Sequence, residues 1–295
     1  MRIVSLLPAA TEIVAAVGAL PELVGVSHEC DFPEAVRQLP RVTTTPIDPG
    51  LASSAIDEHV RALVSAGRAV IAIDTNRLRQ LTPTHIITQD LCEVCAVSDG
   101  EAVRLAAVLD PPPVVVSLSG RTLDGVWQSI ASVGAALGRE AEGQRVSAEL
   151  SGRMATLRAS AATSTPRQVL CIEWLAPPFT AGHWVPEMVE AAGGIDIGAA
   201  PGDHSAERDW AELNGLNPDI VIIMLCGMDV ARSQRELAIL DDPDALDLLG
   251  RVPVWIIDGN AYTSRPGPRL VEGTERIAAA LVGRGLSGLK RWRQD

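Results

Sequence analysis

Sulfur and imidazole groups gather in two short stretches of this sequence. His28 and Cys30 follow one apolar run, and Cys92 and Cys95 follow another. If both runs are strands of one parallel sheet, their carboxyl ends meet at the same edge and the four groups approach one another. Thiolate and imidazole are ligands that zinc and iron accept in proteins, so the pattern predicts a four-ligand metal site. Two alternatives stay open: a redox dithiol at Cys92-x-x-Cys95, and reduced cysteines that contact a ligand or pack the loop.

Aromatic side chains are scarce, with only nine among 295 residues. Five of them fall in segments expected to follow strands, where a single core would not place them. A cleft lined with flat apolar surfaces explains this placement, and packing between lobes is the alternative. For the remaining tryptophans, Trp127, Trp210, Trp255 and Trp292, packing between lobes is the preferred interpretation. The five candidate cleft residues are Phe32, Trp174, Phe179, Trp184 and Tyr262.

No motif for catalysis is found in the sequence. A nucleophile elbow, a phosphate-binding Gly-rich loop and a dinucleotide fingerprint are all missing, and Pro8 stands where the fingerprint glycines would follow the first strand. Carboxylates at strand ends, such as Asp90, are therefore expected to cap loops or to accept hydrogen bonds from a ligand. His183, beside Trp184, is a further candidate for contact with a ligand. We assign no catalytic residue.

A proline-free stretch of almost forty residues, from Thr122 to Ser160, positions these groups. Apolar residues recur in it at helical spacing, and Gly138 and Gly143 are expected to divide it into two helices. The second helix, about Glu140 to Ala159, would be roughly 30 Å long. It predicts three parts: an N-terminal α/β lobe over residues 1–138, a connecting helix over 139–160, and a C-terminal α/β lobe over 161–295.

Short apolar runs alternate with helical patterns on both sides of the long helices. This alternation predicts α/β folding with parallel sheets, and the similar order in the two halves predicts two Rossmann-like lobes with a ligand cleft between them. Thr11 is expected to cap the first helix. The expected strands are 2–7, 23–27, 70–74, 84–89, 114–118, 168–173 and 195–197, with a further buried run after Pro218; the expected helices include 12–17, 56–66 and 185–192.

Composition and charge limit the classes of partner. The chain is 47% hydrophobic and 21% charged, with a net charge of −12 and a pI near 4.9. Nucleic acid and anionic membrane surfaces require basic patches, so neither is expected as a partner. No stretch is long enough for a membrane span, and the first residues do not read as an export signal. Five cysteines, an odd number, favour a reducing compartment. We expect the cytoplasm, or the periplasm or cell surface if a leader has been removed.

Several motifs resemble the substrate-binding proteins of ABC importers for cobalamin and ferric chelates, in which one rigid helix joins two α/β lobes. The resemblance covers nearly the whole chain. The most telling motif runs from Pro177-Pro178-Phe179-Thr180 through Gly193-Gly194, and it is similar to the second-lobe entry of cobalamin-binding members. The other stretches that carry the resemblance are 2–12, 24–33, 81–89, 216–219 and 265–269, the last beginning with Arg265.

The resemblance implies non-catalytic binding of a small-molecule metal chelate, cobalamin or another corrinoid, and an ABC permease as partner. It implies Pro8, Phe32, Asp90, Trp174, Phe179, His183, Trp184, Tyr262 and Arg265 as ligand contacts, and His28, Cys30, Cys92 or Cys95 as contacts to the metal. The chain departs from importer members in having no export signal. Around Cys92 and Cys95 it looks like a subgroup whose ligand is only loosely described. The alternatives are a cytoplasmic zinc or iron protein and an enzyme of corrinoid or tetrapyrrole metabolism.

Overall fold

The computed structural model describes residues 1–90, 99–161 and 165–292. These residues form two compact units, each with its own sheet. Unit 1 comprises Met1–Leu51, Glu58–Gly120 and Asp124–Glu149; unit 2 comprises Ala52–Asp57, Arg121–Leu123 and Leu150–Asp295. The border between Glu149 and Leu150 falls inside a long helix, in the stretch where the sequence predicts a connecting helix.

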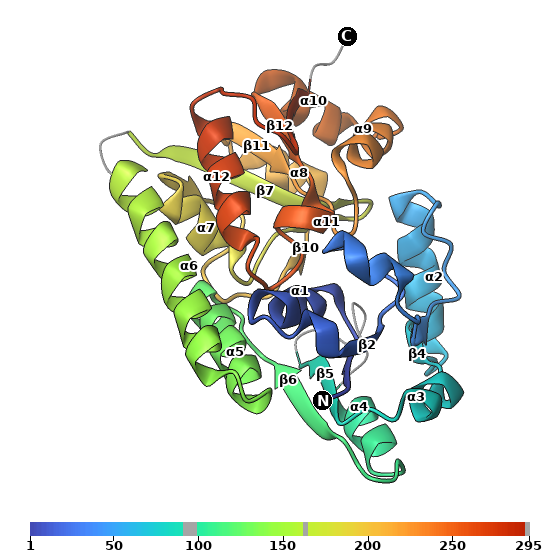
Figure 1. Cartoon of the computed structure of the whole chain (residues 1–295). Helices are drawn as coiled ribbons and strands as arrows, with labels where there is room; N and C mark the ends of the chain where they lie inside the picture. Colours follow the sequence, from blue (N-terminus) through green and yellow to red (C-terminus); the bar gives the residue numbers. More distant parts are fainter. Residues whose placement is uncertain (91–98, 162–164, 293–295) are drawn as a thin grey trace. The chain divides into compact units, whose positions relative to one another are not determined.

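Unit 1 is built on a four-stranded parallel sheet in the order β2-β1-β5-β6. The strands are β1 (Ile3–Ser5), β2 (Leu23–Val26), β5 (His85–Gln89) and β6 (Val114–Leu118). The described helices of unit 1 are α1 (Pro8–Ala16), η1 (Leu20–Glu22), η2 (Glu34–Gln38), α3 (Thr75–Leu81), α4 (Asp99–Ala106) and α5 (Leu123–Ala136), while α2 (Ser53–Ser65) begins in unit 2 and ends in unit 1. The parallel sheet expected from the alternating pattern is confirmed (Figure 1).

Two local predictions in unit 1 are wrong. Helix α1 begins at Pro8, and the Thr11 side chain does not cap it, because proline is well suited to the first helical turn. The expected strand over 70–74 shrinks to β4 (Ala72–Ile73). This strand pairs with β3 (Thr43–Thr44) in a separate antiparallel ribbon, outside the main sheet.

The long proline-free stretch forms two helices, as expected. Helix α6 (Glu140–Ala161) is the longest continuous element in Figure 1. Gly138, with φ +66°, ends the turn after α5. Gly143 does not divide the stretch but lies inside α6, where a Cβ on Gly134 of α5 would come within 2.7 Å of its Cα. Glycine at both positions therefore allows α5 and α6 to approach closely.

Unit 2 is built on a seven-stranded mixed sheet in the order β10-β8-β7-β11-β12-β13, with β9 also pairing with β7. Its central strands β7 (Arg167–Leu175), β11 (Ile220–Ile223) and β12 (Val254–Ile257) are parallel, as expected. The parallel core is flanked by antiparallel pairs that the alternating pattern did not indicate. The remaining strands are β8 (Pro178–Thr180), β9 (Gly194–Asp196), β10 (Ala206–Glu207) and β13 (Leu289–Trp292).

Helices bury both faces of the parallel core of unit 2. Alternate residues of the central strands, such as Leu170, Val221 and Val254, pack with α8 and α10 in one hydrophobic cluster. The residues between them are also buried, which is typical of parallel strands covered on both sides. The helices beginning in unit 2 after α6 are α7 (Val185–Ala191), α8 (Trp210–Gly215), α9 (Val230–Ala238), α10 (Pro243–Arg251), α11 (Gly259–Tyr262) and α12 (Leu270–Leu281).

Candidate functional site

In unit 1, the candidate residues follow the carboxyl ends of neighbouring strands. Pro8 comes three residues after β1 and opens α1. Phe32 lies beyond β2 and is 45% exposed, before a cis peptide bond to Pro33. Asp90 follows β5, and its backbone N–H donates to the carbonyl of Leu118 at the end of β6. The sheet therefore brings these residues to one edge, as the parallel topology predicts. Their contact with a ligand stays a prediction.

A chain of hydrogen bonds determines the state of Cys30. The Thr11 hydroxyl donates to Ser5 Oγ over 2.8 Å, and the Ser5 hydroxyl donates to the carbonyl of Leu7 over 2.9 Å. Cys30 Sγ lies 3.1 Å from Thr11 Oγ1, whose only proton is already directed to Ser5. The Cys30 thiol must therefore be the donor. Cys30, only 2% exposed, is thus held as a protonated thiol among these groups, whereas a metal ligand is a thiolate.

His28 is held by a second buried hydroxyl. Thr43 donates its proton to Ser27 Oγ, and the Nδ1 atom of His28 lies 2.7 Å from Thr43 Oγ1. Because that hydroxyl has no second proton, Nδ1–H of His28 donates and Nε2 keeps its lone pair. Burial, and then the nearby Arg41 charge, lower the pKa of His28. The imidazole is therefore neutral at pH 7, with Nε2 able to bind a metal or a ligand donor.

The predicted four-ligand metal site falls only partly within the described residues. Cys92 and Cys95 lie outside them. Over residues 1–90, 99–161 and 165–292, no group of three or more His, Cys, Asp or Glu side chains is arranged to hold a metal ion. The site stays a prediction.

In unit 2, a tight hairpin positions two of the candidate aromatic residues. Trp174 near the end of β7 is directly opposite Phe179 in β8, and the turn between the strands contains a cis peptide bond before Pro177. Both aromatic residues thus lie in strands rather than in the expected loop. Trp174 is partly buried against the hydrophobic cluster of the unit. Cross-strand aromatic pairs of this kind stabilise a hairpin as well as offering an apolar surface.

The loop after this hairpin holds His183 in an unusual backbone conformation. His183 has φ +54°, its N–H donates to the Asp203 carbonyl over 2.6 Å, and its carbonyl accepts from the Gly202 N–H over 2.9 Å. A Cβ on Gly182 would lie 2.5 Å from the Asp203 carbonyl oxygen, so only glycine allows this approach. These two backbone hydrogen bonds thus fix the His183 backbone. Strained non-glycine residues are often found at functional sites.

Two imidazoles and a guanidinium meet in unit 2. The His183 ring lies 5.5 Å from the Trp184 ring and 5.4 Å, edge-on, from the His204 ring. Arg121 Nη1 lies 3.0 Å from His204 Nε2; because a guanidinium only donates, Nε2 accepts and the His204 proton is on Nδ1. Burial first, then His204 and Arg121, lower the pKa of His183. The His183 ring is therefore neutral at pH 7, and we call His183, His204 and Arg121 the imidazole cluster.

The other candidates in unit 2 are tied to one loop. The indole N–H of Trp184, a side chain only 7% exposed, donates to the Thr263 carbonyl over 2.8 Å. Arg265, also buried, donates to Asn260 over 2.7 Å. Tyr262 packs beneath two guanidinium groups, those of Arg276 at 3.5 Å and Arg269 at 5.4 Å from its ring centroid. Hydrogen bonding and packing within the unit thus account for these residues, and their contact with a ligand stays a prediction.

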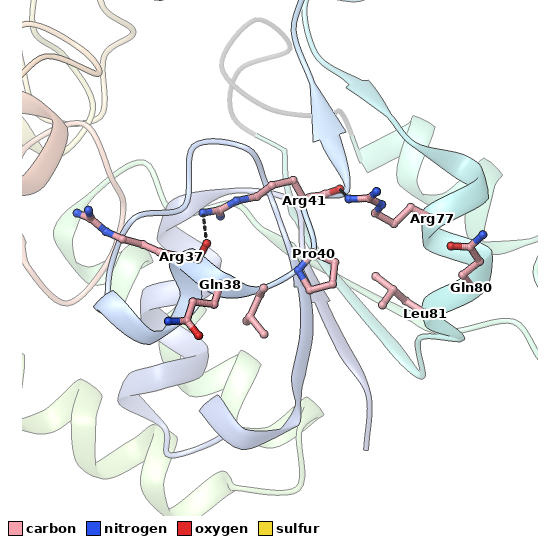
Figure 2. Close-up of a pocket in the computed structure, with 8 residues that line it drawn as sticks. Arg37, Gln38, Pro40, Arg41, Arg77, Gln80 and Leu81 are labelled. Atoms are coloured by element: carbon pink, nitrogen blue, oxygen red, sulfur yellow. Dashed lines mark hydrogen bonds between the residues drawn. The ribbon is translucent and has the colours of Figure 1, made fainter.

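Unit 1 also has an open groove of about 500 Å³ that contains none of the predicted site residues (Figure 2). It is bounded by the end of η2 with the segment after it, and by α3. Three arginines, two glutamines and three apolar residues line it: Arg37, Arg41, Arg77, Gln38, Gln80, Leu39, Pro40 and Leu81. We call it the arginine groove.

Sequence reasoning missed Arg121, Thr43 and the arginine groove, and it left His204 undecided. The hydrogen-bond partners of His204 and His28 lie 83 and 15 residues away in the chain. No local pattern connects residues so far apart. The groove had one weak signal, a group of arginines in an otherwise acidic chain.

The chain folds into two α/β units, and aromatic and imidazole groups lie beyond the carboxyl ends of their strands. This arrangement is typical of α/β proteins that bind ligands. The chain belongs to the periplasmic binding protein family, whose family model matches residues 3–243. The resemblance seen in the sequence is thereby confirmed. No protein of curated function matches the chain.

Solved structures with the same fold match almost the full chain at low sequence identity. The periplasmic haem-binding protein RhuT from Roseiflexus sp. RS-1, in its apo form, has a TM-score of 0.68 and 21% identity, covering 96% of this chain and 98% of its own. The periplasmic vitamin B12 binding protein BtuF of Vibrio cholerae has a TM-score of 0.65 and 21% identity, covering 95% and 96%. A periplasmic haem-binding protein from Pseudomonas aeruginosa has a TM-score of 0.67 and 19% identity, covering 99% and 98%. At these identities the likeness shows the fold. Among the described residues, no helix has the length and apolar character needed to span a bilayer.

Proposed function

We propose that this protein binds a metal chelate with a planar macrocycle, without catalysing a reaction on it, and that a corrinoid of the cobalamin type is the ligand. The observation that carries the proposal is the imidazole cluster beside Trp184. A macrocyclic chelate is a wide apolar disc with a central metal and polar edges. Aromatic faces suit the disc, a neutral imidazole suits the metal, and charged or amide groups suit the edge.

The imidazole cluster is preorganised for binding such a ligand. The His183 backbone is clamped on both sides, so little conformational entropy remains to be lost on binding. Its ring is neutral at pH 7 and therefore keeps a lone pair for a metal. Arg121, always charged, stands next to His204 and can pair with an acidic substituent at the ligand's edge.

Haem is the second candidate ligand, and Arg121 is the observation that favours it. The edge of haem carries carboxylates, which match a guanidinium, whereas the side chains of a corrinoid are amides. Two of the structures with the same fold, from Roseiflexus sp. RS-1 and Pseudomonas aeruginosa, are of haem-binding proteins, and the one from Vibrio cholerae is of a vitamin B12 binding protein.

The proposal includes a partner and a compartment. A binding protein of this family would deliver its chelate to an ABC permease, which requires the protein to work outside the cytoplasm. The odd cysteine count, and Cys30 held as a thiol, favour instead a reducing compartment. Fractionation of the native host with antibodies to the protein decides between the two.

Spectroscopic titration tests the ligand. Cobalamin, cobinamide, haem and a ferric siderophore are each titrated into the full-length protein, and binding is followed in the visible bands of the chelate and by calorimetry. We expect saturable one-to-one binding of a corrinoid, with haem second. If none of the four binds at micromolar concentration, the proposed ligand class is wrong.

A matched pair of variants tests the site. His183→Asn removes the imidazole, and asparagine tolerates positive φ better than most residues, so the loop should remain folded. We expect it to weaken binding about tenfold or more and to shift the visible bands of a bound chelate. His59→Asn, an exposed substitution in α2, should change neither. Equal affinities for the two variants would place the ligand elsewhere. Replacing His28, Cys30, Cys92 and Cys95 together tests axial coordination by that set in the same spectrum.

A further inference from the structure

The arginine groove is a cationic site on an acidic protein. Three arginine residues line it, and no aspartate or glutamate is among its lining residues, although the chain as a whole carries a net charge of −12. Figure 2 shows the Arg41 side chain running toward the Arg37 carbonyl, with Arg77 on the other side, while the Arg37 guanidinium points outward, away from both. Like charges in one place repel one another, so a negative ligand would lower the energy of this arrangement.

Hydrogen bonds to neutral acceptors hold the Arg41 guanidinium in place and leave its positive charge. Its Nη1 donates to the carbonyls of Ser27 at 3.1 Å and Cys30 at 2.8 Å, and its Nη2 donates to the carbonyl of Arg37 at 3.2 Å. All three acceptors are neutral carbonyl groups. Its side chain is half-buried, and over the described part of the chain no carboxylate lies within ion-pair distance of it. Among the described residues, Arg41 is therefore a positioned cation without a counter-ion.

The other two arginines of the groove each donate a hydrogen bond to a backbone carbonyl. Arg37 donates through Nε to the Asp31 carbonyl at 3.1 Å, which leaves its terminal nitrogens available. Arg77 donates to the Arg41 carbonyl at 3.4 Å, and its nearest carboxylate, Asp74, is 3.9 Å away and 42% exposed. An exposed ion pair at that distance contributes little to stability, so Asp74 only weakly neutralises the charge of Arg77.

The walls of the groove are rigid enough to form a site. The segment after η2 is attached to the edge strand β2, because the Val26 N–H donates to the Pro40 carbonyl and the Val42 N–H donates to the Val26 carbonyl. On the other wall, Leu81 at the end of α3 lies over Gly25, where a Cβ would come within 2.6 Å of Leu81 Cδ1. A Cβ at Gly25 would have to displace the end of the Leu81 side chain. The volume of about 500 Å³ is within the range of small-molecule sites.

We propose that the arginine groove binds a small anion with two or more carboxylate or phosphate groups. The planar guanidinium fork matches the paired oxygens of both groups, and Gln38 and Gln80 add neutral hydrogen-bond donors at the rim. The ligand is small because the lining spans only two short segments, 37–41 and 77–81. The groove is built from residues of unit 1, whereas the imidazole cluster is built from residues of unit 2.

Calorimetric titration with citrate and with pyrophosphate, at low ionic strength, tests the proposal and separates the carboxylate from the phosphate source. We expect one anion per chain, with an affinity that falls as salt is added. Arg77→Gln and Arg37→Gln should each weaken binding about tenfold, the effect of losing one charge-assisted hydrogen bond. Arg104→Gln in α4 removes the same charge from unit 1 outside the groove and should leave the affinity unchanged. Far-ultraviolet circular dichroism verifies that all three variants are folded.

Three outcomes would overturn the proposal. The first is that neither anion binds the wild-type protein at millimolar concentration. The second is that Arg104→Gln weakens binding as much as Arg77→Gln, which would indicate a diffuse charge effect. The third is that an oligoglutamate peptide binds in a groove-dependent way while citrate and pyrophosphate do not, which would make the groove a docking site for an acidic protein.

Discussion

Asp196 at the end of β9 offers the sharpest test of the electrostatics in unit 2. Its Oδ1 accepts the backbone N–H groups of Gly198 at 2.8 Å and Ala199 at 3.3 Å, and it accepts a hydrogen bond from the Cys171 thiol. Its Oδ2 is buried without a partner among the described residues. Burial outweighs these hydrogen bonds and raises the pKa of Asp196 from 3.8 to about 6.

The direction of the resulting pH effect follows from linkage. Because the folded state holds the proton more tightly than the unfolded state, Asp196 favours folding below pH 4, and this contribution is lost as pH rises through about 6. A shift of about two pKa units corresponds to at most about 3 kcal/mol, at 1.36 kcal/mol per unit. Asp196→Asn keeps the acceptor for both N–H groups and cannot ionise. The variant should therefore gain up to about 3 kcal/mol relative to wild type between pH 4 and pH 7.

Urea unfolding of both proteins across this pH range measures the difference, in which all other titrating groups cancel. Asp219→Asn is the matched control, since the exposed Asp219 carboxylate also accepts a backbone N–H, from Gln168 at 2.7 Å. It shows how much of any difference comes from exchanging a carboxylate oxygen for an amide oxygen as the acceptor of a backbone N–H. Parallel curves for wild type and Asp196→Asn would refute the reasoning, because they would mean that the folded state leaves the acidity of Asp196 unchanged.

Three further predictions concern the two candidate sites. Gly182→Ala places a Cβ 2.5 Å from the Asp203 carbonyl oxygen and should lower the free energy of unfolding by about 1–3 kcal/mol. Gly152→Ala, which has open space around it in α6, should instead raise that free energy by about 0.5–1 kcal/mol. Thermal melts compare the two variants, and equal effects would contradict the close contact at Gly182. Cys30→Ala removes the hydrogen-bond donor to Thr11 and should lower the free energy of unfolding by about 1–3 kcal/mol, while Cys30→Ser keeps a donor and should lower it less. Urea unfolding measures both variants, and the reverse order would show that the thiol is not the donor. Because burial lowers the pKa of His183, protonation of its ring opposes folding, and stability that is present above pH 6.5 is lost as the pH falls below it. His183→Asn should remove this part of the acid sensitivity. An unchanged pH profile of the free energy of unfolding would contradict the lowered pKa.

Periodicity and punctuation predicted most of the elements of this protein. The strand expected over 114–118 is β6 to the residue, because a short β-branched run that follows three prolines and ends before Ser119-Gly120 strongly favours a strand. The long helices follow from an Ala- and Leu-rich stretch without proline. The predictions that failed concern elements whose structure depends on residues distant in the sequence. β4 pairs only with β3, and Gly143 serves a contact with another helix rather than a helix end.

The sequence by itself determined the α/β class, the long helix, the family and the rule that candidate residues follow the carboxyl ends of strands. These depend on local pattern, which the chain carries wherever it folds. Only the tertiary structure decided which of those residues act on one another. The donor role of the Cys30 thiol, the lowered pKa of His183, the acceptor role of His204 Nε2 and the position of the Arg41 guanidinium all depend on partners remote in sequence. Protonation and charge at a site are set by the groups a few ångströms away in space, and linear order does not encode those distances.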